Sequence, residues 1–300
     1  MKCARPEKLT KIPAILTYGS CTWRRIWSFR PVSLPLSNEN KCADVTYWYA
    51  FYRDRLLLEK RPDGGYEVPC DDTPPTALPA DGVVLSVCTL PDGVDVKAYS
   101  LSEPCDGGLF CETIALRSTY YLLPREQYLL AGKCRELLHW DVTTRFCGAC
   151  GAPMPAPDGI SKRCSECGRE VWPQLSVAII VLVRRGDEML LVHANNFVSD
   201  FFGLVAGFVE TGETLEEAVT REVREETGLT VEHIRYVASQ PWPYPSGLMV
   251  GFFADYRSGE ITLQRSELTA GGWFSRRNLP TLPEPLSIAR RLIDAFLGEK

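Results

Sequence analysis

The alternation of apolar and polar positions divides the chain into two strand-rich parts separated by a helix. β-prone runs at 46–60 and 82–90 are separated by a spacer rich in Pro, Asp and Gly, which predicts a mixed α and β domain. Residues 124–140 then repeat apolar side chains at helical spacing, and the leading Pro124 favours the first turn of a helix. We therefore expect a separate N-terminal domain over residues 1–142.

A second group of strands begins after residue 172. The longest aliphatic run, VAIIVLV at 177–183, is far shorter than the roughly 20 residues of a membrane helix, so it suits a buried strand. No membrane span is expected. The same periodicity predicts a terminal helix over 285–297 and an α+β domain over residues 173–300. Its predicted strands cover residues 177–184, 188–193, 204–209, 231–238, 248–256 and 272–275.

Composition narrows the class of protein. The chain has 300 residues, 45% of them hydrophobic and 24% charged, which is typical of globular domains. Its net charge of -5 gives no general reason to bind nucleic acid. Residues 1–20 lack the apolar core and cleavage site of a secretory signal. Because the twelve cysteines show no disulfide framework, we expect a reducing compartment, the cytoplasm.

Two Cys-x-x-Cys pairs follow the predicted helix. The thiolates of Cys147, Cys150, Cys164 and Cys167 can close a tetrahedron around one ion. Four sulfur ligands leave no open position, so the pattern favours a structural zinc, in a ribbon over residues 143–172. The alternative is two unrelated thiol pairs, or a redox pair.

A glutamate-rich helix follows the predicted strand at 204–209. Thr214 and Glu217 have the spacing of a capping box, and Gly228 stands where a C-terminal glycine belongs. At 100° per residue, Glu226 lies about 40° and Glu225 about 60° from Glu222, and all three share the face of the apolar side chains.

Solubility explains glutamates on the outer face of a helix, but it does not explain glutamates on the apolar face. Like charges that converge on a half-buried face repel one another and lose hydration, so they need cations or protons. Divalent ions that prefer oxygen ligands, Mg²⁺ or Mn²⁺, are the natural partners. Such an ion would neutralise a phosphate substrate and acidify water for attack on phosphorus.

These residues resemble the Nudix box, G-x5-E-x7-R-E-U-x-E-E-x-G-U, in which U is aliphatic. Gly207, Glu213 and residues 221–229 match every fixed position. The resemblance implies the Nudix fold, a mixed sheet between helices, and hydrolysis of a nucleoside diphosphate linked to another group. It also implies that Glu222, Glu225 and Glu226 hold the metal and that Arg221 orients them.

A second motif points to a subgroup. The sequence SQPWPYPSGLM at 239–249 resembles the SQPWPFPxS signature of the NADH pyrophosphatase subgroup, which also has an N-terminal domain and a zinc ribbon. For this subgroup, the resemblance implies cleavage of NADH or NAD⁺ to a nicotinamide mononucleotide and AMP. It further implies removal of NAD caps from RNA, and homodimerisation.

The resemblance assigns further site residues. Phe208 and Trp172 match positions whose aromatic rings lie at the nicotinamide or adenine site, and Trp172 stands where tyrosine is usual. Glu267 matches a further metal-binding glutamate or base. Ala206 and Ala289 match backbone contacts at the metal and the substrate. The motif residues expected to bind substrate are Gln240, Pro241, Trp242, Pro243, Tyr244, Pro245, Ser246 and Gly247.

The motif departs from the signature at two places. Tyr244 replaces the usual Phe, and Ser246 with Gly247 stands where Gln-Ser is common, so a side-chain contact from position 247 is lost. The segment is also consistent with a rigid loop whose Trp242 fills a core. Both interpretations can hold, because a loop stiffened by prolines loses little entropy when a flat ring docks on it.

Three functions are compatible with these patterns. The preferred one is an NAD(H) pyrophosphatase in which water attacks the adenylate-side phosphorus and a carboxylate serves as the base; spacing does not identify which carboxylate. The second is a hydrolase that prefers ADP-ribose or another dinucleotide. The third is an RNA-binding or regulatory protein with an inert Nudix fold. The intact glutamates disfavour the third, and so do the few basic residues of the ribbon, Lys162, Arg163 and Arg169.

Overall fold

The computed structural model describes residues 45–78, 82–108, 110–197 and 199–298, which belong to one compact unit, Asn40–Lys300. Residues 1–20, where no secretory signal is expected, lie outside the described residues, as does the start of the predicted N-terminal domain. In the part of the chain that is described, no helix has both the length and the apolar character needed to cross a membrane.

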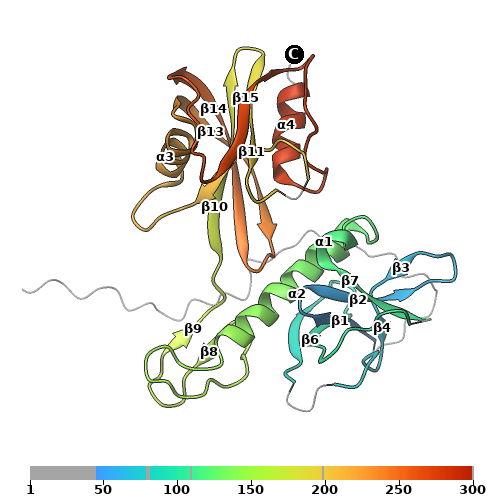
Figure 1. Cartoon of the computed structure of the whole chain (residues 1–300). Helices are drawn as coiled ribbons and strands as arrows, with labels where there is room; N and C mark the ends of the chain where they lie inside the picture. The colour runs from blue at the N-terminus through green and yellow to red at the C-terminus, as the bar shows by residue number, and fades with distance from the viewer. Residues whose placement is uncertain (1–44, 79–81, 109, 198, 299–300) are drawn as a thin grey trace, which may run out of the picture. The chain divides into compact units, whose positions relative to one another are not determined.

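The N-terminal part forms a seven-stranded sheet that packs against a helix (Figure 1). The strand order is β3-β2-β1-β6-β5, with β4 paired to β1 and β7 paired to β2. The central pair, β1 and β6, is parallel. The strands are β1 (Thr46–Tyr52), β2 (Arg55–Lys60), β3 (Tyr66–Glu67), β4 (Cys70–Asp71), β5 (Leu85–Thr89), β6 (Asp95–Ser100) and β7 (Cys111–Ala115).

Two helices follow this sheet, α1 (Leu116–Thr119) and α2 (Arg125–Thr143). Pro124 is the N-cap residue of α2, so the helix begins one residue after the predicted start and continues three residues beyond the predicted end. Tyr128, Gly132 and Cys134 are all buried. Other parts of the protein therefore cover α2 beyond the face that carries its leucines.

The ribbon contains one short antiparallel pair, β8 (Lys162–Arg163) and β9 (Glu170–Val171). Lys162 is only 2% exposed, and its ammonium lies 2.7 Å from Asp141 Oδ1. It also donates a hydrogen bond of 3.0 Å to the Asp141 carbonyl. A buried ammonium is stable only with polar partners such as the Asp141 carboxylate and carbonyl. The Lys162–Asp141 pair therefore links the ribbon to the C-terminal end of α2.

The C-terminal part is a mixed six-stranded sheet of order β13-β14-β10-β11-β15, with β12 paired to β10. Strands β10 and β14 are parallel, and the other pairs are antiparallel. The predicted α+β class is confirmed. The strands are β10 (Ser176–Arg185), β11 (Glu188–Ala194), β12 (Val205–Phe208), β13 (Thr230–Trp242), β14 (Gly247–Ser258) and β15 (Leu268–Ser275).

Helices α3 (Leu215–Thr227) and α4 (Ile288–Gly298) cover opposite faces of this sheet (Figure 1). Alternate residues of β10 point to opposite sides, so Ile179 packs in the core below α3, whereas Ile180 packs in the core below α4. The first of these cores positions the glutamate helix.

Candidate active site

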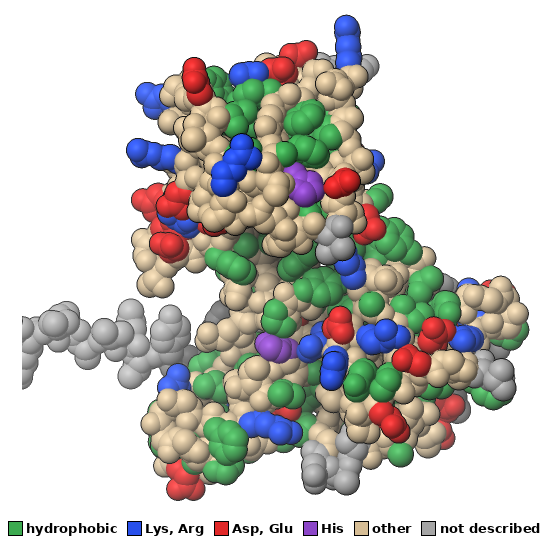
Figure 2. All heavy atoms as spheres, viewed as in Figure 1, with side chains coloured by type: hydrophobic (Ala, Val, Ile, Leu, Met, Phe, Trp, Pro, Cys, Tyr) green, Lys and Arg blue, Asp and Glu red, His purple; other side chains and the backbone are tan. Residues whose placement is uncertain are grey.

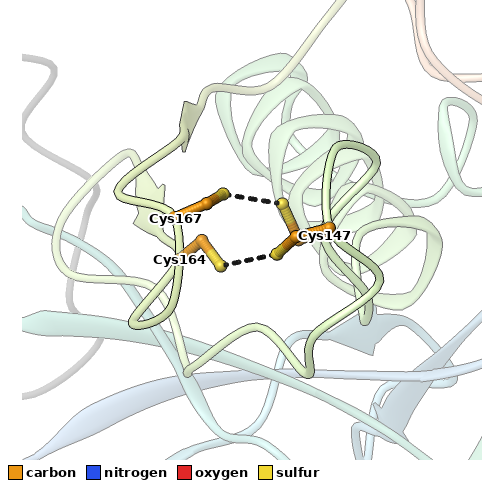
Figure 3. A group of neighbouring side chains, drawn as sticks. Cys147, Cys164 and Cys167 are labelled. Carbon is orange, nitrogen blue, oxygen red and sulfur yellow. Dashed lines mark hydrogen bonds between the residues drawn. The ribbon is translucent and has the colours of Figure 1, made fainter.

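The four cysteines of the two pairs meet in the ribbon. Their sulfur atoms all lie within 4.8 Å of one another, and within the described ranges they form the sole His, Cys, Asp or Glu group this compact. The Cys147–Cys167 and Cys150–Cys164 sulfurs are 3.5 and 3.6 Å apart. Zinc–sulfur bonds of about 2.3 Å in a tetrahedron place sulfurs about 3.8 Å apart. Figure 3 shows the labelled cysteines pointing toward one another.

Backbone N–H groups prepare these sulfurs for a cation. The N–H of Ala149 donates to Cys147 Sγ at 3.4 Å. Donation from the N–H groups of Cys150 and Ala149 lowers the pKa of Cys147 to about 6, because the bonds favour the thiolate. Donation from the Cys167 N–H likewise lowers the pKa of Cys164. The predicted structural zinc therefore fits the cysteines as they are arranged.

The glutamate helix α3 begins and ends as predicted. Thr214 accepts from the Glu217 N–H and the Glu217 carboxylate accepts from the Thr214 N–H, which completes the capping box. Gly228 closes the helix with φ 72°, in the left-handed region that glycine tolerates. Figure 2 shows acidic side chains gathered on the side of the molecule where α3 lies.

Two of the three predicted glutamates are buried on the apolar face of α3. Glu222 is 9% exposed and Glu226 4% exposed, as the helical wheel predicts. The prediction is wrong for Glu225, whose side chain is 55% exposed. Glu225 and Glu226 lie on either side of Glu222 around the helix, and of these two only Glu226 is covered by the core at this end of α3.

Glu226 is a buried carboxyl without a compensating partner. Burial, followed by the charges of Glu222, Glu267 and Glu225, raises its pKa to about 8. No described side chain forms an ion pair or hydrogen bond with it. Burial also raises the pKa of Glu222, although Arg221 opposes this shift. The Glu226 carboxyl therefore holds a proton near neutral pH in the metal-free protein, and a divalent cation can replace that proton.

The Arg221 side chain forms ion pairs with three neighbouring carboxylates at once. Its guanidinium lies 2.6 Å from Glu213 Oε1, 2.8 Å from Glu222 Oε1 and 3.2 Å from Glu225 Oε2. It also donates to the Phe208 carbonyl at 3.0 Å. The bidentate pair with Glu213 fixes the plane of the guanidinium. Sequence reasoning gave Glu213 no role, although its fixed place in the Nudix box was the available signal.

Strand β12 places backbone directly against Glu222. A Cβ atom at Gly207 would collide with the Glu222 carboxylate, so only glycine allows this approach. Ala206, the residue expected to offer a backbone contact to metal, precedes it and is exposed.

A loop brings Glu267 to the same cluster. The Gln264 N–H donates to the Glu226 carbonyl at 2.8 Å, and the Glu267 N–H donates to the Gln264 carbonyl at 2.9 Å. These bonds place the Glu267 charge close enough to raise the pKa of both buried glutamates. Unlike the cysteines, the four glutamates do not converge within the span of a single ion among the described residues.

The raised pKa of Glu226 predicts that both the stability of the metal-free protein and its affinity for Mg²⁺ change with pH. The folded carboxyl keeps its proton to about pH 8, against 4.5 for its usual value. Its contribution to stability is therefore fully present below pH 4.5 and is lost as pH rises through about 8. In EDTA, the melting temperature should fall as pH rises from about 5 to 9, and Mg²⁺ affinity should rise over the same range because the ion competes with the proton.

Thermal unfolding in EDTA and calorimetric titration with Mg²⁺ measure these two trends. Glu226→Gln cannot titrate at this position and should flatten both curves. If the melting temperatures of the wild type and of Glu226→Gln change with pH in the same way in EDTA, Glu226 does not cause the pH dependence.

The aromatic-proline segment is a β-hairpin rather than a separate loop. Strand β13 continues to Trp242, four residues beyond the predicted end, and a four-residue turn leads into β14 at Gly247. Pro241 is tolerated inside β13 because this strand lies at the edge of the sheet. The turn is fixed by Ser246, whose Oγ donates to the Gln174 carbonyl at 2.7 Å.

The hairpin partly buries its aromatic side chains. The Trp242 and Tyr244 rings meet edge to face at 5.2 Å, and the Arg117 guanidinium lies 5.5 Å from the Trp242 ring. Pro243 is buried. A Cβ atom at Gly247 would approach the Trp242 carbonyl to 3.2 Å, so a larger residue at this position would need the hairpin to shift slightly.

The remaining predicted residues lie in different places. Phe208 ends β12 and is 66% exposed, and Trp172 follows β9 and is 49% exposed. Ala289 is buried with α4 on the opposite face of the sheet from α3, so the structure does not bring it to the glutamates. Gln240 connects this region to the hairpin through a 3.1 Å bond to the Leu286 carbonyl.

Family models match three successive parts of the chain. Residues 45–140 match an NADH pyrophosphatase-like rudimentary NUDIX domain, 143–171 an NADH pyrophosphatase zinc ribbon domain, and 172–296 a NUDIX domain. A NUDIX hydrolase structure from Nitrosomonas europaea is similar, with a TM-score of 0.45 and 20% identity, over 52% of this chain and 92% of that one.

Curated relatives share the sequence at higher identity. The NAD-capped RNA hydrolase NudC of Stutzerimonas stutzeri is 41% identical over 211 residues, 70% of this chain and 76% of that protein. The protein of the same name from Pseudomonas aeruginosa PAO1 is 46% identical over 176 residues, 58% of this chain. The matched region spans 63% of the length of the Pseudomonas relative.

Proposed function

Because the chain belongs to the Nudix hydrolase family, we propose that it is a metal-dependent NAD(H) pyrophosphatase that releases a nicotinamide mononucleotide and AMP. The observation that carries this proposal is the pair of buried carboxyls on α3, Glu222 and Glu226, beside the guanidinium of Arg221. The NADH pyrophosphatase-like domains and the NAD-capped RNA hydrolases among the relatives support NADH, NAD⁺ and NAD-capped RNA as substrates.

The residues of the site have two proposed roles, to hold the metal ion and to orient its ligands. Glu222, Glu226 and Glu267 would hold Mg²⁺ or Mn²⁺ with the Ala206 carbonyl, and Glu225 would complete the set from the exposed edge. When bound, the ion supplies charge neutralisation for the diphosphate and activation of water. Arg221 holds three carboxylates in place, so the ligands are oriented before substrate arrives. One of these carboxylates takes the proton from the attacking water.

The hairpin and the two exposed rings select the substrate. Trp242 and Tyr244 form a wall that is rigid before binding, so little entropy is lost when a planar base packs against it. Phe208 and Trp172 are exposed enough to stack on a base from another side. We also propose that the Ala289 backbone contacts the substrate, because Gln240 of β13 donates a hydrogen bond to the carbonyl of Leu286, three residues before Ala289.

Hydrolysis rates on four substrates test the proposed function. Wild-type chain with Mg²⁺ or Mn²⁺ should cleave NADH, NAD⁺ and NAD-capped RNA faster than ADP-ribose, because only the first three present a second base to the aromatic wall. A clear preference for ADP-ribose would instead support the related dinucleotide hydrolase. An RNA-binding role is disfavoured because Lys162 is buried in an ion pair with Asp141.

We also propose that the active form is a cytoplasmic homodimer. The described cysteines are all free thiols, and four of them must be reduced to bind zinc, which fits a reducing compartment. Exposed large apolar side chains such as Phe146, Ile160 and Leu175 support contact with a second copy.

A further inference from the structure

One face of α2 contacts the tip of the hairpin. Tyr128, Gly132 and Glu136 follow one another at intervals of four residues, so they share a face of the helix. Each of them meets a different residue of the segment 243–247. The N-terminal domain therefore contributes a continuous surface to the hairpin that the proposed function assigns to substrate selection.

The first two contacts join side chains that are distant in sequence. The Tyr128 and Tyr244 hydroxyls lie 3.1 Å apart, although 116 residues separate them. The hydroxyl that distinguishes Tyr244 from the usual phenylalanine thus has its partner on α2. At Gly132, a Cβ atom would lie 3.1 Å from Pro243 Cγ, so glycine allows the buried proline to rest against the helix.

Glu136 forms the third contact. Its carboxylate accepts from the Gly247 N–H, while burial raises its pKa to about 7. The Oε1 atom is buried and has no hydrogen-bond partner among the described residues. A half-buried carboxyl with one orphaned oxygen costs stability, so its place against the start of β14 is better explained by a role than by packing alone.

We propose that α2 sets the position of the hairpin tip for substrate recognition, with Tyr128, Gly132 and Glu136 as positioning residues. The N-terminal domain then shapes affinity for the dinucleotide through the Trp242–Tyr244 wall. This inference rests on the proposed function, because it takes that wall as the surface on which a base of the substrate packs.

Gly132→Ala is the sharpest variant. Alanine is a better helix former than glycine, so the domain should fold at least as well, yet the added methyl presses on Pro243. The Kd for NADH, followed by its fluorescence in EDTA, should rise about fivefold, and kcat with Mg²⁺ should stay within about twofold. Lys133→Ala is the matched control, because the charge of the neighbouring residue Lys133 acts on the Cys88 thiol of the N-terminal sheet, lowering its pKa.

Two substitutions of Glu136, one to Ala and one to Gln, provide a second test. Glu136→Ala should weaken NADH binding about fivefold because it removes the acceptor of the Gly247 N–H, and Glu136→Gln should restore binding because its amide oxygen still accepts. Hydrogen exchange of residues 240–248 should quicken in Gly132→Ala and Glu136→Ala, with no change in α3.

The outcomes separate the two proposals. If the wild type binds NADH in EDTA but does not hydrolyse it with metal, the proposed function fails. The Kd values of the variants for NADH then still test the role of α2. The inference is overturned if both Gly132→Ala and Glu136→Ala bind NADH as the wild type does, if Lys133→Ala weakens binding equally, or if the wild type does not bind NADH.

Discussion

Glu226→Gln should lower kcat for NADH hydrolysis by about 10³-fold, since it removes a charge that the transition state needs and preserves the shape of the side chain. Glu226 is 4% exposed and its pKa is raised to about 8, so the metal-free protein already holds this group uncharged near neutral pH. A neutral amide should therefore be accepted without loss of stability, and the melting temperature in EDTA should be maintained.

Glu216→Gln is the matched control on the same helix. Glu216 is exposed in the first turn of α3, away from Glu222 and Glu226, so its substitution should change kcat by less than about twofold. Steady-state rates with saturating Mg²⁺ measure both variants. Equal rates for Glu226→Gln and the wild type would remove the α3 glutamates from the mechanism.

Cys147→Ser should abolish zinc binding and unfold the ribbon. Cys147 is 4% exposed and accepts two backbone hydrogen bonds as a thiolate, which serine cannot reproduce as a zinc ligand. The ribbon pairs only two residues in each of its strands, so zinc must supply most of its folding energy. Loss of the ribbon also exposes the Lys162–Asp141 pair, and the melting temperature should fall by about 5 to 10 °C.

Metal analysis by mass spectrometry and thermal unfolding test this prediction together. The wild type should carry about one zinc ion per chain. Cys88→Ser is the control, because Cys88 is half-buried in β5 and lies outside the cluster. Full zinc content in Cys147→Ser would show that the cysteines do not act as one site.

The local signals of the sequence were sufficient for the glutamate helix. Its capping box, its C-terminal glycine and the burial of Glu222 and Glu226 all follow from residues within one turn or two of each other. Glu225 was misjudged because a helical wheel gives the direction of a side chain but not how far the neighbouring strands extend to cover it.

Contacts between distant segments could not be predicted. The parallel pairing of β1 with β6 and the contact of Tyr128 with Tyr244 depend on how separate elements fold back on one another. Likewise, β13 extends to Trp242 because it is an edge strand, a place in the sheet that its proline-rich end does not reveal.

The products formed from NADH in ¹⁸O-labelled water test the central claim most directly. With Mg²⁺, the wild type should release AMP and reduced nicotinamide mononucleotide in equal amounts, with the label in AMP, as expected if water attacks the adenylate-side phosphorus. Release of free nicotinamide with ADP-ribose, or no metal-dependent turnover of NADH, would contradict the account.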